Sequence, residues 1–99
     1  MTGSELIAAE RLRQIHEKGY DAAHDDRHDY GVLAIIAAGL AVQHTDATVS
    51  DPRLRVDGRS DVWDLAQKHR YDHIRCLTIA GALIAAEIDR LQRDEGSED

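Results

Sequence analysis

The feature that most constrains the fold is an uninterrupted apolar run. From Val32 to Val42 every side chain is aliphatic or is replaced by the hydrogen of Gly39. A helix that is apolar on all sides must be covered on all sides, by other helices or by a second subunit. Small residues let neighbouring backbones approach closely, which offsets the cost of Gly39, about 1 kcal/mol relative to alanine. The sequence therefore predicts a helix over about residues 30–44, central in a bundle or placed in an oligomer interface.

Two further segments repeat apolar residues at helical spacing. In the first, residues 4–18, Thr2 and Glu5 fit a capping box, and Gly19 follows as a stop signal. The second covers about residues 71–93, and we expect its apolar stripe to face the core. That stripe consists of Ile74, Leu77, Ala80, Gly81, Ile84, Ile88 and Leu91.

Length and composition favour one small helical domain. The 99 residues include one tryptophan, three tyrosines, no phenylalanine and one proline, which suits closely packed Ala/Leu/Ile helices better than a sandwich or barrel. Residues 45–60 carry the proline and alternating charges without a sustained period, so we expect a long loop, and a short helix can begin at Asp61. We predict an all-α bundle of three to four helices over residues 1–93, followed by an acidic frayed tail over 94–99.

Charge and cysteine content exclude several classes. A net charge of −7 argues against general nucleic-acid binding. The single Cys76 cannot form an internal disulfide, and we expect a packed thiol in a reducing compartment. The longest apolar run is far short of the roughly 20 residues that cross a bilayer, and no leader precedes it. These observations predict a cytoplasmic protein without a membrane partner. The short chain and its apolar helix also predict a homo-oligomer.

The stretch His24-Asp25-Asp26-Arg27-His28-Asp29 lies directly before the apolar run. Its side chains have three interpretations: polar groups that cap the next helix, with Asp29 as the cap; direct contacts to an organic ligand; or ligands of a divalent metal, for which histidine and carboxylate together suit zinc, manganese or iron. Glu87, beside the apolar stripe of the last helix, should be partly buried, and it needs an ion pair with Arg11 or Arg13, a metal, or a proton. The candidate metal ligands are His24, Asp25, Asp26, His28 and Glu87.

Cationic side chains gather before and at the start of the last helix, where free amides and the helix dipole favour anions. A phosphate-bearing ligand can therefore bind an acidic protein here. On the first helix, Glu10, Arg13, Gln14 and Glu17 share one face, for which we expect a solvated, ion-paired surface or part of the site. The candidate ligand contacts are Arg13, Gln14, His24, Asp26, Lys68 and Arg75.

Several segments together resemble a widespread group of small, largely uncharacterised phage and prophage proteins. The strongest are Glu10-Arg11-Leu12-Arg13-Gln14, His24-Asp25-Asp26-Arg27-His28 and the run from Ala80 to Leu91, AGALIAAEIDRL. The resemblance implies an accessory role in nucleotide metabolism or counter-defence inside a bacterial host cell. The chain is also distantly similar to MazG-like all-α nucleotide pyrophosphohydrolases, which bind magnesium through acidic residues on facing helices. Helix 30–44 departs from that pattern because it has no acidic residue.

We predict that the chain is a non-enzymatic or weakly enzymatic helical homo-oligomer that binds a nucleotide or nucleotide signal. The alternative is a metal-dependent nucleotide pyrophosphohydrolase, in which one carboxylate of the metal site activates water. A protein-binding inhibitor that uses the acidic surface is a second alternative.

Overall fold

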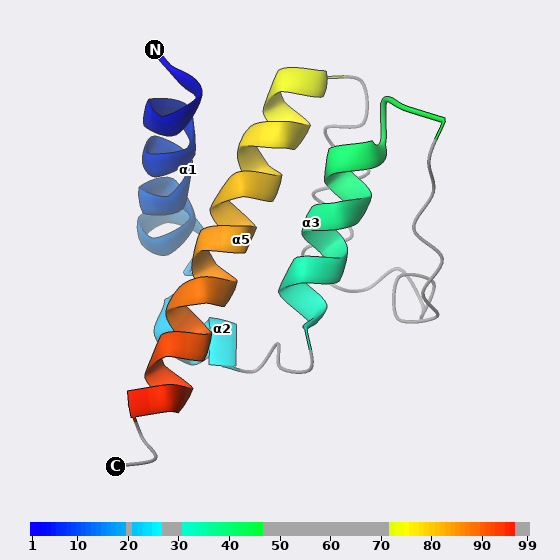
Figure 1. Cartoon of the computed structure of the whole chain (residues 1–99). Coiled ribbons are helices and arrows are strands. Elements are labelled where there is room, and N and C mark those ends of the chain that lie inside the picture. Colours follow the sequence, from blue (N-terminus) through cyan, green and yellow to red (C-terminus); the bar gives the residue numbers. More distant parts are fainter. Residues whose placement is uncertain (20, 27–30, 47–71, 97–99) are drawn as a thin grey trace.

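The described part of the chain consists of helices. The structure is a computed structural model, and it describes residues 1–19, 21–26, 31–46 and 72–96. Its elements are α1 (Gly3–Lys18), α2 (Ala22–Asp26), α3 (Val32–Val42) and α5 (His73–Gly96). Figure 1 shows α5 between α1 and α3, and α5 makes the extensive contacts with α1, α2 and α3. The predicted all-α class is confirmed. Within the described residues, the middle position belongs to α5, and the apolar α3 packs along one side of it.

The ends of α1 follow the predicted signals. The Glu5 N–H donates to Thr2 Oγ1 at 3.2 Å, and the Thr2 N–H donates to Glu5 Oε1 at 2.9 Å, which completes the capping box. Gly19 then ends the helix in the left-handed conformation, with φ of 70°. Both predictions are confirmed.

The other helix ends differ from the expectation. The N-cap position of α3 belongs to Gly31, with φ of 78° and no side-chain cap, rather than to Asp29, which lies outside the described residues. A short helix, α2, includes the first three residues of the stretch 24–29 that precedes the apolar run. At the other end of the chain, α5 continues to Gly96, beyond the expected end at Arg93. The loop over 45–60 and the helix at Asp61 fall almost entirely outside the described residues.

The core forms between α3 and α5. The buried face of α3 consists of Leu33, Ile36, Ala37 and Leu40. It packs against a row of mostly small side chains on α5. Burying one large aliphatic side chain stabilises the fold by about 1.5–3 kcal/mol, and small residues on the facing helix allow the close approach that such burial needs. The Cys76 thiol is packed in this core, as predicted. Burial raises the pKa of the thiol most, and the negative charge of Asp72 raises it further. The α5 residues of the core are Cys76, Ile79, Ala80, Leu83 and Ala86.

The stripe predicted to face the core is largely exposed, and this part of the prediction is wrong. Ile74, Leu77, Ile84, Ile88 and Leu91 are between 44% and 70% exposed. The error has a physical origin: α5 carries two apolar rows with the same three-and-four spacing. The row with the larger side chains was expected to face the core. The helix instead buries the row with the smaller side chains, because these let α3 come close.

Helix α1 approaches α5 at a glycine. A Cβ atom added at Gly81 would lie 2.5 Å from Ile7 Cδ1 and 2.7 Å from Ile7 Cγ1. Both distances are far below van der Waals contact, so the Ile7 side chain occupies the space that any larger residue at position 81 would need. Gly81 therefore sets the distance between the two helices.

Gly81→Ala tests this contact. The substitution gains about 1 kcal/mol of helix propensity, but its Cβ collides with Ile7, and we expect a net loss of about 1–2 kcal/mol in unfolding free energy. In an Ile7→Ala background the same substitution should be neutral or stabilising. Urea denaturation of the four proteins, followed by circular dichroism, gives the coupling. Equal effects in both backgrounds would contradict the proposed contact.

Candidate functional site

A buried carboxylate lies at the centre of the α1–α5 contact. Glu10 is 2% exposed and Gln14 is 0% exposed, although both belong to the face that was expected to be solvated. The expectation of ion pairing on this face is confirmed, but the expectation of solvation is wrong for these two residues. They follow Ile7 at helical spacing, and that row of α1 faces α5.

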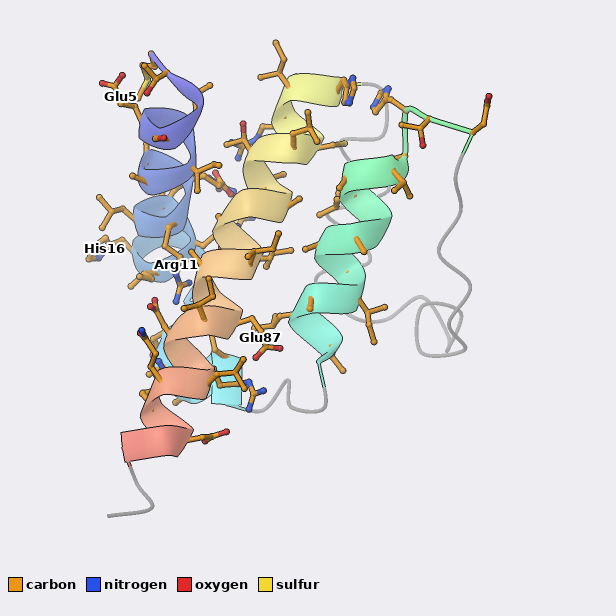
Figure 2. All side chains as sticks on the ribbon, viewed as in Figure 1. Glu5, Arg11, His16 and Glu87 are labelled. Carbon is orange, nitrogen blue, oxygen red and sulfur yellow. The ribbon has the colours of Figure 1, made fainter. Side chains whose placement is uncertain are left out.

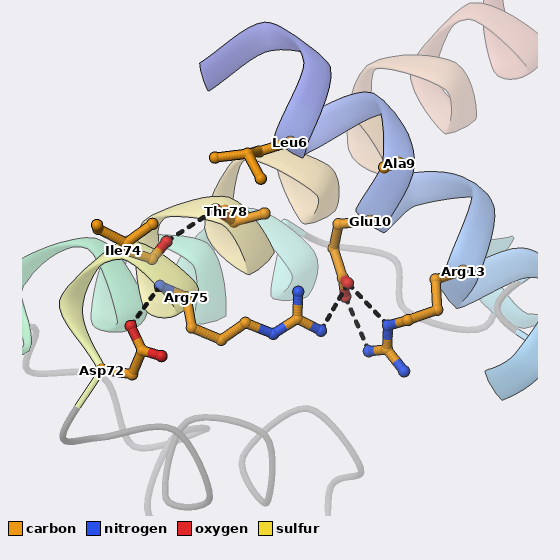
Figure 3. A pocket seen from close by; sticks show the side chains of 8 residues that line it. All are labelled: Leu6, Ala9, Glu10, Arg13, Asp72, Ile74, Arg75 and Thr78. Carbon is orange, nitrogen blue, oxygen red and sulfur yellow. Dashed lines mark hydrogen bonds and ion pairs between the residues drawn. The ribbon is translucent and has the colours of Figure 1, made fainter. Parts of the chain in front are cut away.

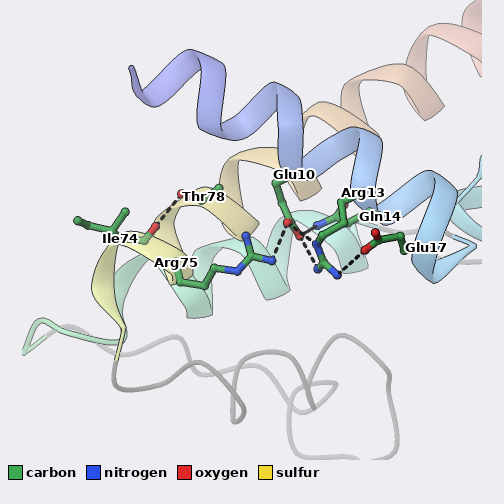
Figure 4. A network of polar contacts seen from close by, with 7 residues as sticks. All are labelled: Glu10, Arg13, Gln14, Glu17, Ile74, Arg75 and Thr78. Carbon is green, nitrogen blue, oxygen red and sulfur yellow. Dashed lines mark hydrogen bonds and ion pairs between the residues drawn. The ribbon is translucent and has the colours of Figure 1, made fainter. Parts of the chain in front are cut away.

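Two arginines from different helices bind the Glu10 carboxylate (Figure 4). Arg13 donates through Nε to Oε1 at 2.8 Å and through Nη2 to Oε2 at 2.9 Å, a two-pronged contact within α1. From α5, Arg75 Nη2 lies 2.7 Å from Oε1. Gln14 adds a hydrogen bond from Nε2 to Oε2 at 3.1 Å. Glu10 thus joins α1 to the first turn of α5.

The electrostatics keep these groups charged. Burial alone raises the pKa of Glu10, but hydrogen bonds from Arg13 and Arg75, together with their charges, outweigh it and lower the pKa below its ordinary value. The hydrogen bond to Glu10 in turn raises the pKa of Arg13. Two guanidinium groups therefore share the Glu10 carboxylate, and Arg13 Nη1 also lies 3.7 Å from Glu17 Oε2.

An open pocket of about 390 Å³ lies beside the carboxylate, between α1 and the start of α5 (Figure 3). Arg13 and Arg75 line its polar side, and both side chains are 29% exposed. Apolar side chains and Asp72 form the rest of the wall. Asp72 Oδ1 accepts a hydrogen bond from the backbone N–H of Arg75 at 3.0 Å and so caps α5. The lining residues are Leu6, Ala9, Glu10, Arg13, Asp72, Ile74, Arg75 and Thr78.

Of the six predicted ligand contacts, Arg13 and Arg75 line the pocket, whereas Gln14 is fully buried and does not line it. Lys68 and the side chains of His24 and Asp26 lie outside the described residues. Glu10 was expected on a face that forms a solvated surface or part of the site, but its burial beside the two arginines was not predicted. The spacing of Ile7, Glu10 and Gln14, at i, i+3 and i+7, could have indicated that this polar pair shares a face with an apolar anchor.

Two of the predicted metal ligands, Asp25 and Glu87, have described side chains, and both bind an arginine. Asp25 is 1% exposed, and its Oδ2 accepts a hydrogen bond from Arg11 Nη2 at 2.8 Å. Glu87 bonds through Oε1 to Arg90 Nε on its own helix, so the expected pairing of Glu87 with Arg11 or Arg13 is wrong. Among the described residues, no group of three or more His, Cys, Asp or Glu side chains is arranged to hold a metal. The side chains of His24, Asp26 and His28 are not described.

Glu87 differs from the other buried acids in one respect. It is 7% exposed and lies on the side of α5 that faces α3 (Figure 2). Its second carboxylate oxygen, Oε2, is buried and has no hydrogen-bond partner among the described residues. Within the same part of the chain, Gln14 Oε1 also has none. Unpartnered buried oxygens are uncommon in folded proteins and favour a missing donor or cation.

No family model, curated protein or solved structure matches the chain. The resemblances to phage and prophage proteins and to the MazG-like enzymes therefore stay predictions. In the part of the chain that is described, no helix has both the length and the apolar composition needed to cross a bilayer.

Glu10→Gln tests the electrostatic role of the carboxylate. Because the pKa of Glu10 is lowered in the folded state, its charge stabilises the fold above the unfolded pKa of about 4.3, and this contribution is lost as the pH falls through the folded pKa. We expect Glu10→Gln to lower the unfolding free energy by about 2 kcal/mol at pH 7. Urea denaturation at several pH values should show the difference from wild type shrinking below about pH 4.

The matched control is Glu17→Gln, at an exposed carboxylate of the same helix whose Oε2 lies 3.7 Å from Arg13 Nη1. Its effect should stay within about 0.5 kcal/mol. A loss for Glu10→Gln that is constant from pH 7 to pH 3 would show that shape, and not charge, is what matters at this position.

Proposed function

We propose that the chain binds a phosphate-bearing small molecule of the nucleotide type in the pocket between α1 and α5. The observation that carries the proposal is the convergence of Arg13 and Arg75, from two helices, on one carboxylate at the wall of an open pocket. Guanidinium groups that bind a carboxylate in this way also bind phosphate, because the two anions present similar pairs of oxygens.

Arg75 is the better placed phosphate ligand. Arg13 uses Nε and Nη2 for Glu10 and has Nη1 near Glu17, whereas Arg75 contacts Glu10 through Nη2 alone. Within the described residues, the other guanidinium N–H groups of Arg75 have no hydrogen-bond partner, so they are available to an anion. Glu10 holds the guanidinium in place before a ligand arrives, and this pre-organisation lowers the entropic cost of binding.

The rest of the pocket suits the remainder of a nucleotide. Leu6 and Ile74 supply apolar surface on which a base or sugar can pack, and the volume of about 390 Å³ lies within the usual range for small-molecule sites. The Asp72 carboxylate, which caps α5, competes with an anion for the helix amides. The phosphate is therefore held by side chains, and Asp72 is left to accept hydrogen bonds from ribose hydroxyls or base amino groups.

The biological role that we propose is capture of a nucleotide or nucleotide signal inside a bacterial host cell, as part of the accessory functions of a phage or prophage. This role rests on the resemblance of the segments ERLRQ, HDDRH and AGALIAAEIDRL to proteins of phages and prophages. Capture needs affinity and no chemical step, and a pre-organised arginine site supplies affinity.

Isothermal titration against linear and cyclic nucleotides tests the proposal. We expect binding by at least one nucleotide, a loss of tenfold or more in affinity with Arg75→Gln, and unchanged affinity with Lys18→Gln, which removes a cation at the exposed end of α1. Glu10→Gln should bind more weakly, because Arg75 loses the carboxylate that holds its guanidinium in place. Absence of heat with every nucleotide, or equal losses for Arg75→Gln and Lys18→Gln, would refute it.

A metal-dependent nucleotide pyrophosphohydrolase is the second candidate. The observation that favours it is Glu87 Oε2, a buried carboxylate oxygen for which the described part of the chain supplies no hydrogen-bond partner, since a divalent cation would satisfy it. In this proposal a divalent metal would be held by Glu87 together with His24, Asp25, Asp26 and His28, and it would supply Lewis-acid activation for hydrolysis of the phosphate chain.

Elemental analysis and a phosphate-release assay test this candidate. We expect a divalent metal to co-purify in roughly stoichiometric amount, and both His24→Ala and Glu87→Gln should lower metal content and pyrophosphate release more than tenfold. Glu17→Gln, at the exposed carboxylate on α1, serves as the control and should keep both. Metal-free protein that gains no activity on addition of magnesium, manganese or zinc would eliminate the enzyme.

A further inference from the structure

The charged side chains that line the pocket between α1 and α5 balance one another. Arg13 and Arg75 supply two positive charges, and Glu10 and Asp72 supply two negative charges. The pKa of Glu10 is lowered, so this carboxylate is ionised at neutral pH. Glu17 adds a further carboxylate, with Oε2 at 3.7 Å from Arg13 Nη1. The described wall of the pocket therefore offers an anion no net positive charge.

Both carboxylates of the lining are held in place. Glu10 is 2% exposed and is bound by two arginines and an amide. Asp72 is exposed, but its Oδ1 accepts the backbone N–H of Arg75 at 3.0 Å and caps α5. Fixed carboxylates repel a ligand that carries too much negative charge, because they cannot turn away into solvent. The pocket should therefore discriminate between anions by their charge.

One edge of a guanidinium group remains for the phosphate. Arg13 is occupied by Glu10 and Glu17. Arg75 contacts Glu10 through Nη2 only, and Nη2 carries two N–H groups, one on each of the two-pronged edges of a guanidinium. The edge that Glu10 does not use keeps both of its N–H groups, and the described residues supply no partner for them. Two parallel N–H groups bind two oxygens of one phosphate.

Phosphate groups differ in the charge and in the oxygens that they present. A phosphodiester carries one negative charge and two non-bridging oxygens, whereas a terminal phosphate carries about 1.5–2 negative charges at pH 7 and three such oxygens. One guanidinium edge neutralises a diester and pairs with both of its oxygens. A terminal phosphate would leave about one negative charge unpaired beside the fixed carboxylates of Glu10 and Asp72.

We infer that the pocket selects nucleotides whose phosphate is a diester over those with a terminal mono-, di- or triphosphate. This inference rests on the proposed function, because it names the class of nucleotide that the same site takes. A diester closed within one nucleotide, as in a cyclic nucleotide, suits the pocket further, since its ring has fewer rotatable bonds to immobilise. Arg75 binds the phosphate, and Leu6 and Ile74 pack on the base or sugar.

Isothermal titration of the full chain with matched ligands tests the selection. For each of the four ribonucleosides, the cyclic monophosphate, the methyl ester of the monophosphate and the monophosphate itself are compared without divalent metal. The methyl ester is an open diester, so it separates charge from ring closure. With the base that binds, we expect both diesters to bind about tenfold more tightly than the monophosphate, because only the monophosphate brings an unpaired charge.

The outcomes separate this inference from the proposed function. A monophosphate that binds as tightly as its methyl ester, or more tightly, would overturn the selection and leave nucleotide binding intact. Absence of heat with every ligand would refute both. A methyl ester that binds more tightly than the cyclic form and the monophosphate would support selection by charge and would assign an open diester to the pocket.

Asp72→Asn tests the cause of the selection. Asparagine keeps an oxygen for the cap of α5 but removes one of the two fixed negative charges. The ratio of the affinities for methyl ester and monophosphate should fall to about threefold, and a loss common to both ligands cancels in this ratio. Asp89→Asn, the same change at an exposed carboxylate about 26 Å further along α5, is the matched control and should keep the ratio. An unchanged ratio in Asp72→Asn would overturn the electrostatic selection.

Discussion

The Glu10 carboxylate is the interaction on which the position of α1 depends. The fully buried residues of α1 are Glu10 and Gln14, both polar, so this helix is not held by a large apolar face. Its attachment to α5 combines the ion pair of Glu10 with Arg75 and the contact of Ile7 with Gly81. A carboxylate buried at such a place is tolerated because two arginines and an amide satisfy it. The same ion pairs hold the guanidinium groups of Arg13 and Arg75 in place at the pocket.

Helix α5 organises the remaining structure because it uses different arcs of its surface for different contacts. One arc, with Cys76, Ile79 and Leu83, packs on α3 and forms the apolar core. A second arc meets α1 around Arg75 and Gly81. The exposed stripe occupies a third. Such a division needs a helix that is apolar over most of its circumference but carries small residues where neighbours come close, and the alanines and glycine of α5 meet this requirement.

Local sequence rules determine where α1 begins and ends, whereas packing determines which face of α5 is buried. The capping box of Thr2 and Glu5 and the glycine stop at Gly19 are local, and both were predictable. The choice between two apolar rows of α5 was not, because periodicity is equal in both and only the approach of α3 decides. Arg13 and Arg75 could be proposed as ligand contacts from their charge, whereas the burial of Glu10 could not be assigned. Its spacing with Ile7 allows a shared inward face, but only the packing of α5 decides whether that face is buried.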